Sequence, residues 1–186
     1  MLRWDGRLTV LNRVFDSYNI ENHLNCRVLN ISFKIFLFLT IILFKVQVLI
    51  AGELYDVSID AMIDIKSAIK TAKSSNKHVF IKAGGNWCGW CKLYEKFSNS
   101  DEDIAELMKN EYVSALVNYS PENKNLEAMT FLGNPQRFGF PVFIILNGDG
   151  EVLHTQDTAL LEQGKSYNKN HVLRFLKSWT YKALNP

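Results

Sequence analysis

A short apolar stretch, two glycines and two closely spaced cysteines follow one another in mid-chain, and this order constrains the fold most. The stretch "HVFIKA" at 78–83 is rich in residues that favour β-structure and predicts a strand. "GGN" then turns the chain, and "WCGWCKLYEKF" carries Cys88 and Cys91 into a segment that predicts a helix up to about Phe97. Cysteines at this spacing form a redox pair, supply half of a metal site or simply pack, and the surrounding sequence must decide between these roles.

The rest of the chain alternates helical and extended patterns. Strands that alternate with helices imply parallel pairing, and the turn sequence "NGDG" near the end adds an antiparallel hairpin. We therefore expect an α/β domain over 53–186, with a mixed central sheet of about four strands and helices on both faces. The other expected elements are helices over 58–73, from a Ser100 cap onward, over 121–132 and over 168–184, and strands over 111–120, 141–146 and 151–155.

An apolar segment near the N-terminus predicts export. Residues 35–44 carry no charge, but a lysine follows directly, and the run is shorter than the roughly 20 apolar residues of a transmembrane helix. A basic residue before the run and small residues after it fit a secretory signal peptide over 29–52. Export to the periplasm is the expectation. A membrane anchor retained over 31–51 and a buried core helix are the alternatives.

A signal peptide should begin a chain, yet residues 1–28 precede this one. Our hypothesis is that translation starts near Leu29 and that 1–28 is a leader of doubtful status. Cys26 would then be lost, and residues 53–186 would hold just two cysteines. A disulfide across two intervening residues closes almost no loop, so it stabilises little through chain entropy. The pair is therefore expected to serve chemistry rather than stability.

The charge distribution argues against nucleic acid as a partner. Residues 1–52 hold six of the 21 basic residues and three of the 19 acidic ones, which leaves 15 basic against 16 acidic residues in 53–186. A nucleic-acid-binding domain carries a clustered basic excess. The part of the chain expected to fold has none.

The element order, together with "NWCGWCK" at 86–92 and "GFPVFIILNGDGEV" at 139–152, resembles the thioredoxin superfamily. The resemblance covers about 58–183 and is greatest to the exported thioredoxin-like proteins of bacteria. It implies a thioredoxin-like fold and a thiol–disulfide oxidoreductase without a bound cofactor. It also implies that Pro141 opens its strand with a cis peptide bond and faces the cysteines.

The resemblance assigns roles to the two cysteines. Cys88 would lie exposed at a helix N-terminus, where unpaired N–H groups favour a thiolate, so its pKa is expected below the free value of about 8.5. Cys88 would attack a client disulfide, and Cys91, one turn further along, would resolve the mixed disulfide. The reducing direction is expected on the resemblance alone.

Neighbouring residues would support this site. Trp87 would support the loop, and the backbone of Phe140 would pair with an extended client beside Cys88. Gly89 lies between the cysteines, as does Trp90, which shields Cys91, offers clients an apolar contact or simply packs. Lys92 is expected to be a solvated lysine, with thiolate stabilisation as the alternative.

One position departs from the family pattern. Thioredoxins carry a buried aspartate six residues before the first cysteine, where this chain has Lys82. A lysine cannot act as a carboxylate base. Glu95, four residues after Cys91 on the same helix face, is expected to be a solvated charge, with a substitute for that aspartate as the alternative.

Two other functions compete with disulfide exchange. A zinc site needs four ligands, and beyond the two cysteines only His78, His154 and His171 remain in the folded part. The other competitor is a binding module that holds polypeptides with an idle cysteine pair. For the preferred function we expect a monomer, proteins with disulfides or thiols as substrates, and a membrane electron-transfer protein as reductant.

Overall fold

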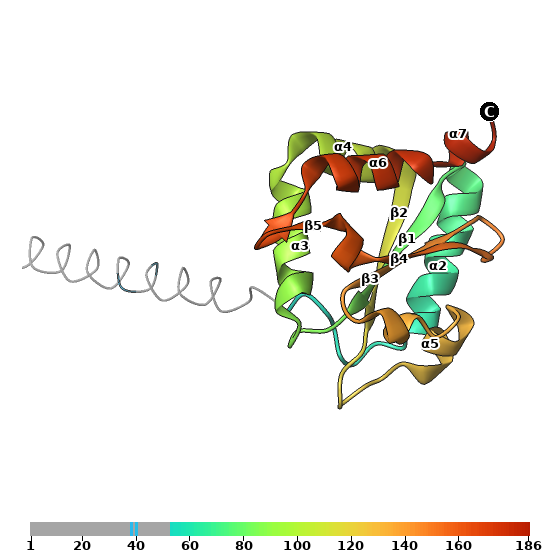
Figure 1. Ribbon diagram of the computed structural model, residues 1–186. Coiled ribbons are helices and arrows are strands. Elements are labelled where there is room, and N and C mark those ends of the chain that lie inside the picture. Colours follow the sequence, from blue (N-terminus) through green and yellow to red (C-terminus); the bar gives the residue numbers. More distant parts are fainter. Residues whose placement is uncertain (1–37, 39, 41–52) are drawn as a thin grey trace, which may run out of the picture. The chain divides into compact units, whose positions relative to one another are not determined.

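A four-stranded mixed sheet organises the part of the chain that the structure describes, residues 38, 40 and 53–186 of a computed structural model (Figure 1). The strand order is β2-β1-β3-β4. β1 and β2 run parallel, and β3 and β4 form the predicted antiparallel hairpin. β1 and β3 also pair antiparallel, whereas the alternation of helices and strands predicted parallel pairing. The strands are β1 (His78–Gly84), β2 (Tyr112–Asn118), β3 (Val142–Leu146) and β4 (Val152–Asp157).

Helices cover both faces of this sheet (Figure 1). One face packs against α2 (Ala61–Ser75) and α5 (Leu126–Phe131). The opposite face packs against α3 (Gly89–Ser100), α4 (Glu102–Glu111) and α6 (Lys169–Ser178). Shorter elements complete the fold: two 3-10 helices, η1 (Pro135–Phe138) and η2 (Thr158–Leu161), the two-stranded sheet of β5 (Glu162–Gln163) and β6 (Ser166–Tyr167), and α7 (Tyr181–Leu184).

The alternation of side chains along β1 builds both cores. Val79, Ile81 and Ala83 belong to the core beneath α2, whereas Phe80 belongs to the core beneath α3 and α6. Successive side chains of a strand point to opposite faces, and a central strand covered on both sides is therefore apolar throughout. Lys82 is the exception, and it shares the face of Phe80. This strand leads directly to the cysteines.

Several helix boundaries differ from the predicted ones: α2 begins at Ala61 instead of 58, and α5 begins at Leu126 instead of 121. The cap of α4 is Asp101 rather than Ser100, because α3 continues through Ser100, and the Asp101 carboxylate accepts the Ile104 N–H at 3.2 Å. The last predicted helix is two helices, because Thr180 caps α7 by accepting the Ala183 N–H at 3.1 Å. The sequence patterns did not predict the 3-10 helices or the β5–β6 pair.

The predicted leader over 1–28 and signal peptide over 29–52 lie outside the described residues, apart from Phe38 and Thr40. They remain expectations. Across the described stretches, no helix combines the length and the apolar character that crossing a membrane requires.

Candidate functional site: the Cys88–Cys91 disulfide

The two cysteines form a disulfide at the start of α3. The S–S distance is 2.02 Å and the Cα atoms lie 5.3 Å apart. Cys88 is the N-cap of α3, and its Sγ accepts the Cys91 N–H at 3.1 Å. The first N–H groups of a helix have no partner within the helix. The sulfur of Cys88 therefore takes the place that a serine or aspartate oxygen takes at other helix N-termini.

The disulfide is more covered than the sequence suggested. Cys88 is 4% exposed and Cys91 is 3% exposed, so the expected exposure of Cys88 is wrong for this oxidised state. Tyr55, Trp90 and Phe140 pack around the pair and cover it. Little of either cysteine is therefore in contact with solvent in this state.

A glycine at the end of β1 lets the second sulfur sit against the backbone. A Cβ placed on Gly84 would lie 2.5 Å from Cys91 Sγ and 2.7 Å from the Tyr55 hydroxyl oxygen. No real Cβ makes contacts this short, so a residue with a side chain fits here only if the sulfur or the tyrosine moves. Burial raises the pKa of the Tyr55 hydroxyl, and the nearby Glu95 carboxylate raises it further, which keeps this hydroxyl neutral.

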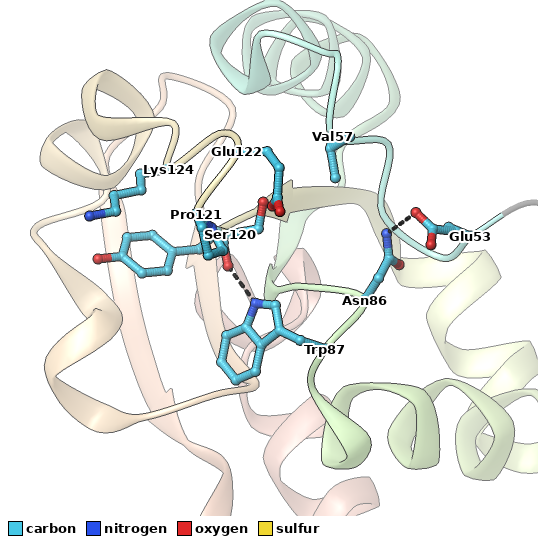
Figure 2. Close-up of a pocket in the computed structure, with 9 residues that line it drawn as sticks. Glu53, Val57, Asn86, Trp87, Ser120, Pro121, Glu122 and Lys124 are labelled. Atoms are coloured by element: carbon cyan, nitrogen blue, oxygen red, sulfur yellow. Dashed lines mark hydrogen bonds between the residues drawn. The ribbon is translucent and has the colours of Figure 1, made fainter.

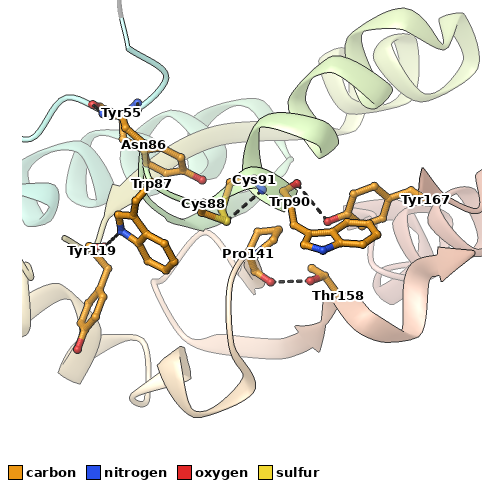
Figure 3. The surroundings of a disulfide bond; sticks show 10 residues. All are labelled: Tyr55, Asn86, Trp87, Cys88, Trp90, Cys91, Tyr119, Pro141, Thr158 and Tyr167. Atoms are coloured by element: carbon orange, nitrogen blue, oxygen red, sulfur yellow. Dashed lines mark hydrogen bonds between the residues drawn. A yellow bond between two sulfur atoms is a disulfide. The ribbon is translucent and has the colours of Figure 1, made fainter. Parts of the chain in front are cut away.

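Figure 3 shows Pro141 beside Cys88, with Trp87 and Trp90 on either side. The Phe140–Pro141 peptide bond is cis. Pro141 is buried, and its carbonyl oxygen accepts a hydrogen bond from the Thr158 hydroxyl at 2.6 Å. The segment before β3 is thus tied to η2 at the point where it approaches the disulfide.

Trp87 is 58% exposed, yet it has a fixed place. Its indole N–H donates to the Tyr119 carbonyl at 2.8 Å. Phe140 lies between the two aromatic rings, edge-to-face with Trp87 at 5.6 Å and stacked on Tyr119 at 5.1 Å. Through these contacts Trp87 connects the loop before α3 to the loop after β2 and to the segment before β3.

The residues after Cys88 divide between packing and solvent. Trp90 is half-buried, edge-to-face with Tyr167 at 5.5 Å, and its carbonyl accepts the Tyr167 hydroxyl at 3.4 Å. Gly89 is exposed, and a Cβ there would meet nothing within 4 Å. Lys92 is exposed on α3.

An ion pair lies on the α3 side of the sheet. The Lys82 ammonium lies 2.5 Å from a Glu95 carboxylate oxygen, and the two side chains are 13% and 29% exposed. Burial alone would raise the pKa of Glu95, but the hydrogen bond and charge of Lys82, with a hydrogen bond from Asn99, outweigh burial and lower it. Glu95 is therefore a half-buried, paired carboxylate rather than a solvated charge.

The three histidines of the zinc alternative make other contacts. His78 Nδ1 lies 2.8 Å from the Trp179 carbonyl, His154 stacks on the Trp179 ring at 4.5 Å, and the backbone N–H of His171 bonds to Asn168. In the stretches that the structure describes, no three His, Cys, Asp or Glu residues cluster so as to hold a metal ion.

Sequence reasoning missed Tyr55, Tyr119, Thr158 and Tyr167. Each reaches the site through a contact between distant segments, and no local pattern marks any of them.

The sequence of this chain is similar to parts of known proteins. The chain spans only a small part of two curated relatives: "Uncharacterized protein B0495.5" from Caenorhabditis elegans, 27% identical over 45% of this chain and 12% of that protein, and "Spermatogenesis-associated protein 20" from Rattus norvegicus, 35% identical over 28% of this chain and 7% of that protein.

Among solved structures, the chain is similar to a disulphide isomerase from Xylella fastidiosa Temecula1, with a TM-score of 0.61 and 23% identity over 69% of this chain and 97% of that one. It also matches a thioredoxin from Thermus thermophilus, with a TM-score of 0.43 and 20% identity over 60% of this chain and 80% of that one. The first of these likenesses confirms the thioredoxin-like fold.

A family model named Thioredox_DsbH, described as "Protein of unknown function, DUF255", matches residues 56–181. That range contains both cysteines, Pro141 and all four strands of the main sheet. The chain therefore belongs to the Thioredox_DsbH family of the thioredoxin superfamily.

Proposed function

We propose that this protein is a thiol–disulfide oxidoreductase that reduces disulfides in client polypeptides through Cys88 and Cys91. One observation carries the proposal: the Cys88 sulfur caps α3 and accepts the Cys91 N–H at 3.1 Å. After reduction, the same N–H and the positive end of the helix favour a thiolate over a thiol at Cys88. The thiolate is the nucleophile that disulfide exchange needs.

The exchange proceeds in two steps that balance. The Cys88 thiolate attacks one sulfur of the client disulfide, a mixed disulfide forms, and the other client sulfur leaves as a thiolate that takes up a proton. Cys91 then loses its proton and attacks the Cys88 sulfur, which releases the second client thiol. Two electrons pass from the cysteine pair to the client, and the Cys88–Cys91 disulfide results.

The cover over Cys88 limits how a client can approach. Trp87, Trp90 and Pro141 border the sulfur in Figure 3. A client must present its disulfide as an extended segment beside Phe140, whose backbone would pair with it over a short span. Folded regions with buried disulfides would be poor substrates.

A polypeptide-binding module with an idle cysteine pair is the second candidate, and the 4% exposure of Cys88 favours it. Reduction of insulin by the full chain, with dithiothreitol as electron source, separates the two. We expect Cys88→Ser to lower the rate to the uncatalysed background, and Cys91→Ser to accumulate a covalent mixed disulfide with the client. A rate that Cys88→Ser leaves unchanged would favour the binding module.

The direction of exchange follows from the reduction potential of the pair. Thioredoxin-type reductants lie near about −270 mV and DsbA-type oxidants near about −120 mV. For a reductase we expect a midpoint below about −230 mV in equilibrium with glutathione. A value near the oxidant end would reverse the proposed direction.

We further propose that the protein acts after export to the periplasm, as a monomer, and is re-reduced by a membrane electron-transfer protein. A membrane anchor over 31–51 is the alternative to cleavage. Mass spectrometry of the native protein tests both the signal and the start: a mature N-terminus just after Ala51 or Gly52 is expected. An abundant peptide from 8–27 would contradict the hypothesis that residues 1–28 are not part of the protein.

A further inference from the structure

A surface pocket of about 790 Å³ opens beside Trp87, on the side away from Trp90 (Figures 2 and 3). Its walls come from the loop before α3, the loop after β2 and the chain before α2. Nothing in disulfide exchange itself requires this pocket. Its lining includes Glu53, Asn86, Trp87, Ser120, Glu122 and Lys124.

Trp87 gives the pocket a fixed aromatic surface. Besides its hydrogen bond to Tyr119 and its contact with Phe140, the ring lies against the backbone, since a Cβ on Gly85 would be 2.5 Å from the indole nitrogen. A large aromatic ring that is 58% exposed and held on several sides loses little freedom when a ligand covers it. An exposed indole face attracts cations.

Two carboxylates add negative charge to the same pocket. Glu53 accepts a hydrogen bond from the Asn86 side chain at 2.8 Å. A hydrogen bond from the Ser120 hydroxyl lowers the pKa of Glu122, which keeps this side chain anionic at neutral pH. Among the described residues that line the pocket, Lys124 is the one cation, and Figure 2 places it at the end away from Glu53. The lining therefore carries a net negative charge.

We propose that this pocket binds an arginine side chain of the client, a few residues from the client's reacting cysteine. The proposal rests on the proposed function, because it names a class of client for the same site. A guanidinium can stack on the Trp87 ring and bond a carboxylate with its N–H groups, which suits arginine better than lysine. Trp87 precedes Cys88 in the chain, so an extended client reaches the pocket within a few residues at about 3.3 Å each.

Matched peptides test the proposal on the full chain. Each peptide carries one cysteine as a mixed disulfide with 2-mercaptoethanol, and an arginine or its uncharged isostere citrulline at one of four positions on either side. The measured quantity is the ratio of the rates at which the reduced protein reduces the two peptides. We expect a ratio of about five to ten at one position. The ratio should fall towards one as the salt concentration rises to 0.5 M, because salt screens exposed charges.

Variants of the pocket carboxylates test whether the preference for arginine peptides arises in this pocket. Glu53→Gln and Glu122→Gln should each lower the ratio at least twofold. Glu127→Gln removes an exposed carboxylate of α5 that does not line the pocket, and should leave the ratio unchanged. A ratio near one at every position, or an equal loss in all three variants, would overturn the proposal.

A binding measurement separates this proposal from the proposed function. In the Cys88→Ser/Cys91→Ser chain, arginine peptides should shift the NMR signal of the Trp87 indole N–H, and citrulline peptides should not. Cys88-dependent reduction without an arginine preference would refute the pocket and leave the exchange function standing. Arginine-selective shifts without any Cys88-dependent reduction would refute the exchange function and, with it, the selection of clients by this pocket.

Discussion

Gly84→Ala should lower the stability of the oxidised protein, because the new methyl group would overlap atoms of the site. The new Cβ would lie 2.5 Å from Cys91 Sγ and 2.7 Å from the Tyr55 hydroxyl, whereas atoms in ordinary contact are about 3.5–4.0 Å apart. The overlap is therefore about 1 Å on two sides. The sulfur cannot retreat freely, because its bond to Cys88 fixes it. Overpacking of this kind costs about 1–3 kcal/mol.

Alanine also reduces the conformational entropy of the unfolded chain relative to glycine. This effect stabilises the folded protein by about 0.4–1 kcal/mol and offsets part of the overpacking cost. We therefore expect the free energy of unfolding of the oxidised protein to fall by about 1–2 kcal/mol. Urea unfolding followed by circular dichroism measures it, and the transition should move to lower urea with an unchanged slope.

Gly89→Ala is the matched control, because a Cβ on Gly89 meets nothing within 4 Å and alanine is favoured over glycine in a helix by about 0.5–1 kcal/mol. It should leave stability unchanged or slightly raised. Equal stability of Gly84→Ala and the unmodified protein would show that the Cys91 sulfur does not lie against the backbone of β1.

Three further predictions concern the surroundings of the site. Lys82→Met leaves the half-buried Glu95 carboxylate without its cation and should lower the free energy of unfolding by about 1–3 kcal/mol, whereas Lys92→Met, at an exposed lysine, should change it by less than about 0.5 kcal/mol. The pKa of Glu95 is lower when folded, so its contribution is present above the usual value of 4.5 and disappears as the pH falls below it; Glu95→Gln should flatten the fall in stability below that pH. Thr158→Val leaves the buried Pro141 carbonyl unpaired and should cost about 1–3 kcal/mol in thermal and urea unfolding, and Thr158→Ser, which keeps the hydroxyl, should cost clearly less.

Local patterns predicted the main elements because each of them has a local cause. The run "HVFIKA" became β1, since a strand covered on both faces must be apolar throughout. "NGDG" became a hairpin, since the Asn147 side chain accepts the N–H groups of Asp149 and Glu151, and Gly150 supplies a positive φ of 85°. Helix ends were less predictable, because Ser100 and Asp101 are both good caps and the packing of α3 chose between them.

In the candidate site too, local sequence predicts some features, whereas others depend on contacts between distant segments. The position of Cys88 at a helix N-terminus follows from a strand, a turn and a helix in succession, and local sequence is enough to predict it. Its burial does not follow, because Tyr55 and Phe140 come from segments 33 and 52 residues away. Hydrogen bonds between Tyr55 and Asn86 bring the first to the disulfide, and the pairing of β1 with β3 brings the second. Likewise, Lys82 pairs with Glu95 only because β1 and α3 share one face of the sheet.

The contrast between a covered sulfur and an exposed tryptophan suggests how such a site would choose clients. Cys88 is 4% exposed, so a chance collision with a thiol or disulfide seldom reaches it, whereas Trp87 next to it is 58% exposed and held by Tyr119 and Phe140. Binding beside Trp87 would then come before chemistry at Cys88, and affinity for the polypeptide, more than the reactivity of the thiolate, would set which disulfides are exchanged. A site arranged in this order gains selectivity from the same burial that slows its unassisted reaction.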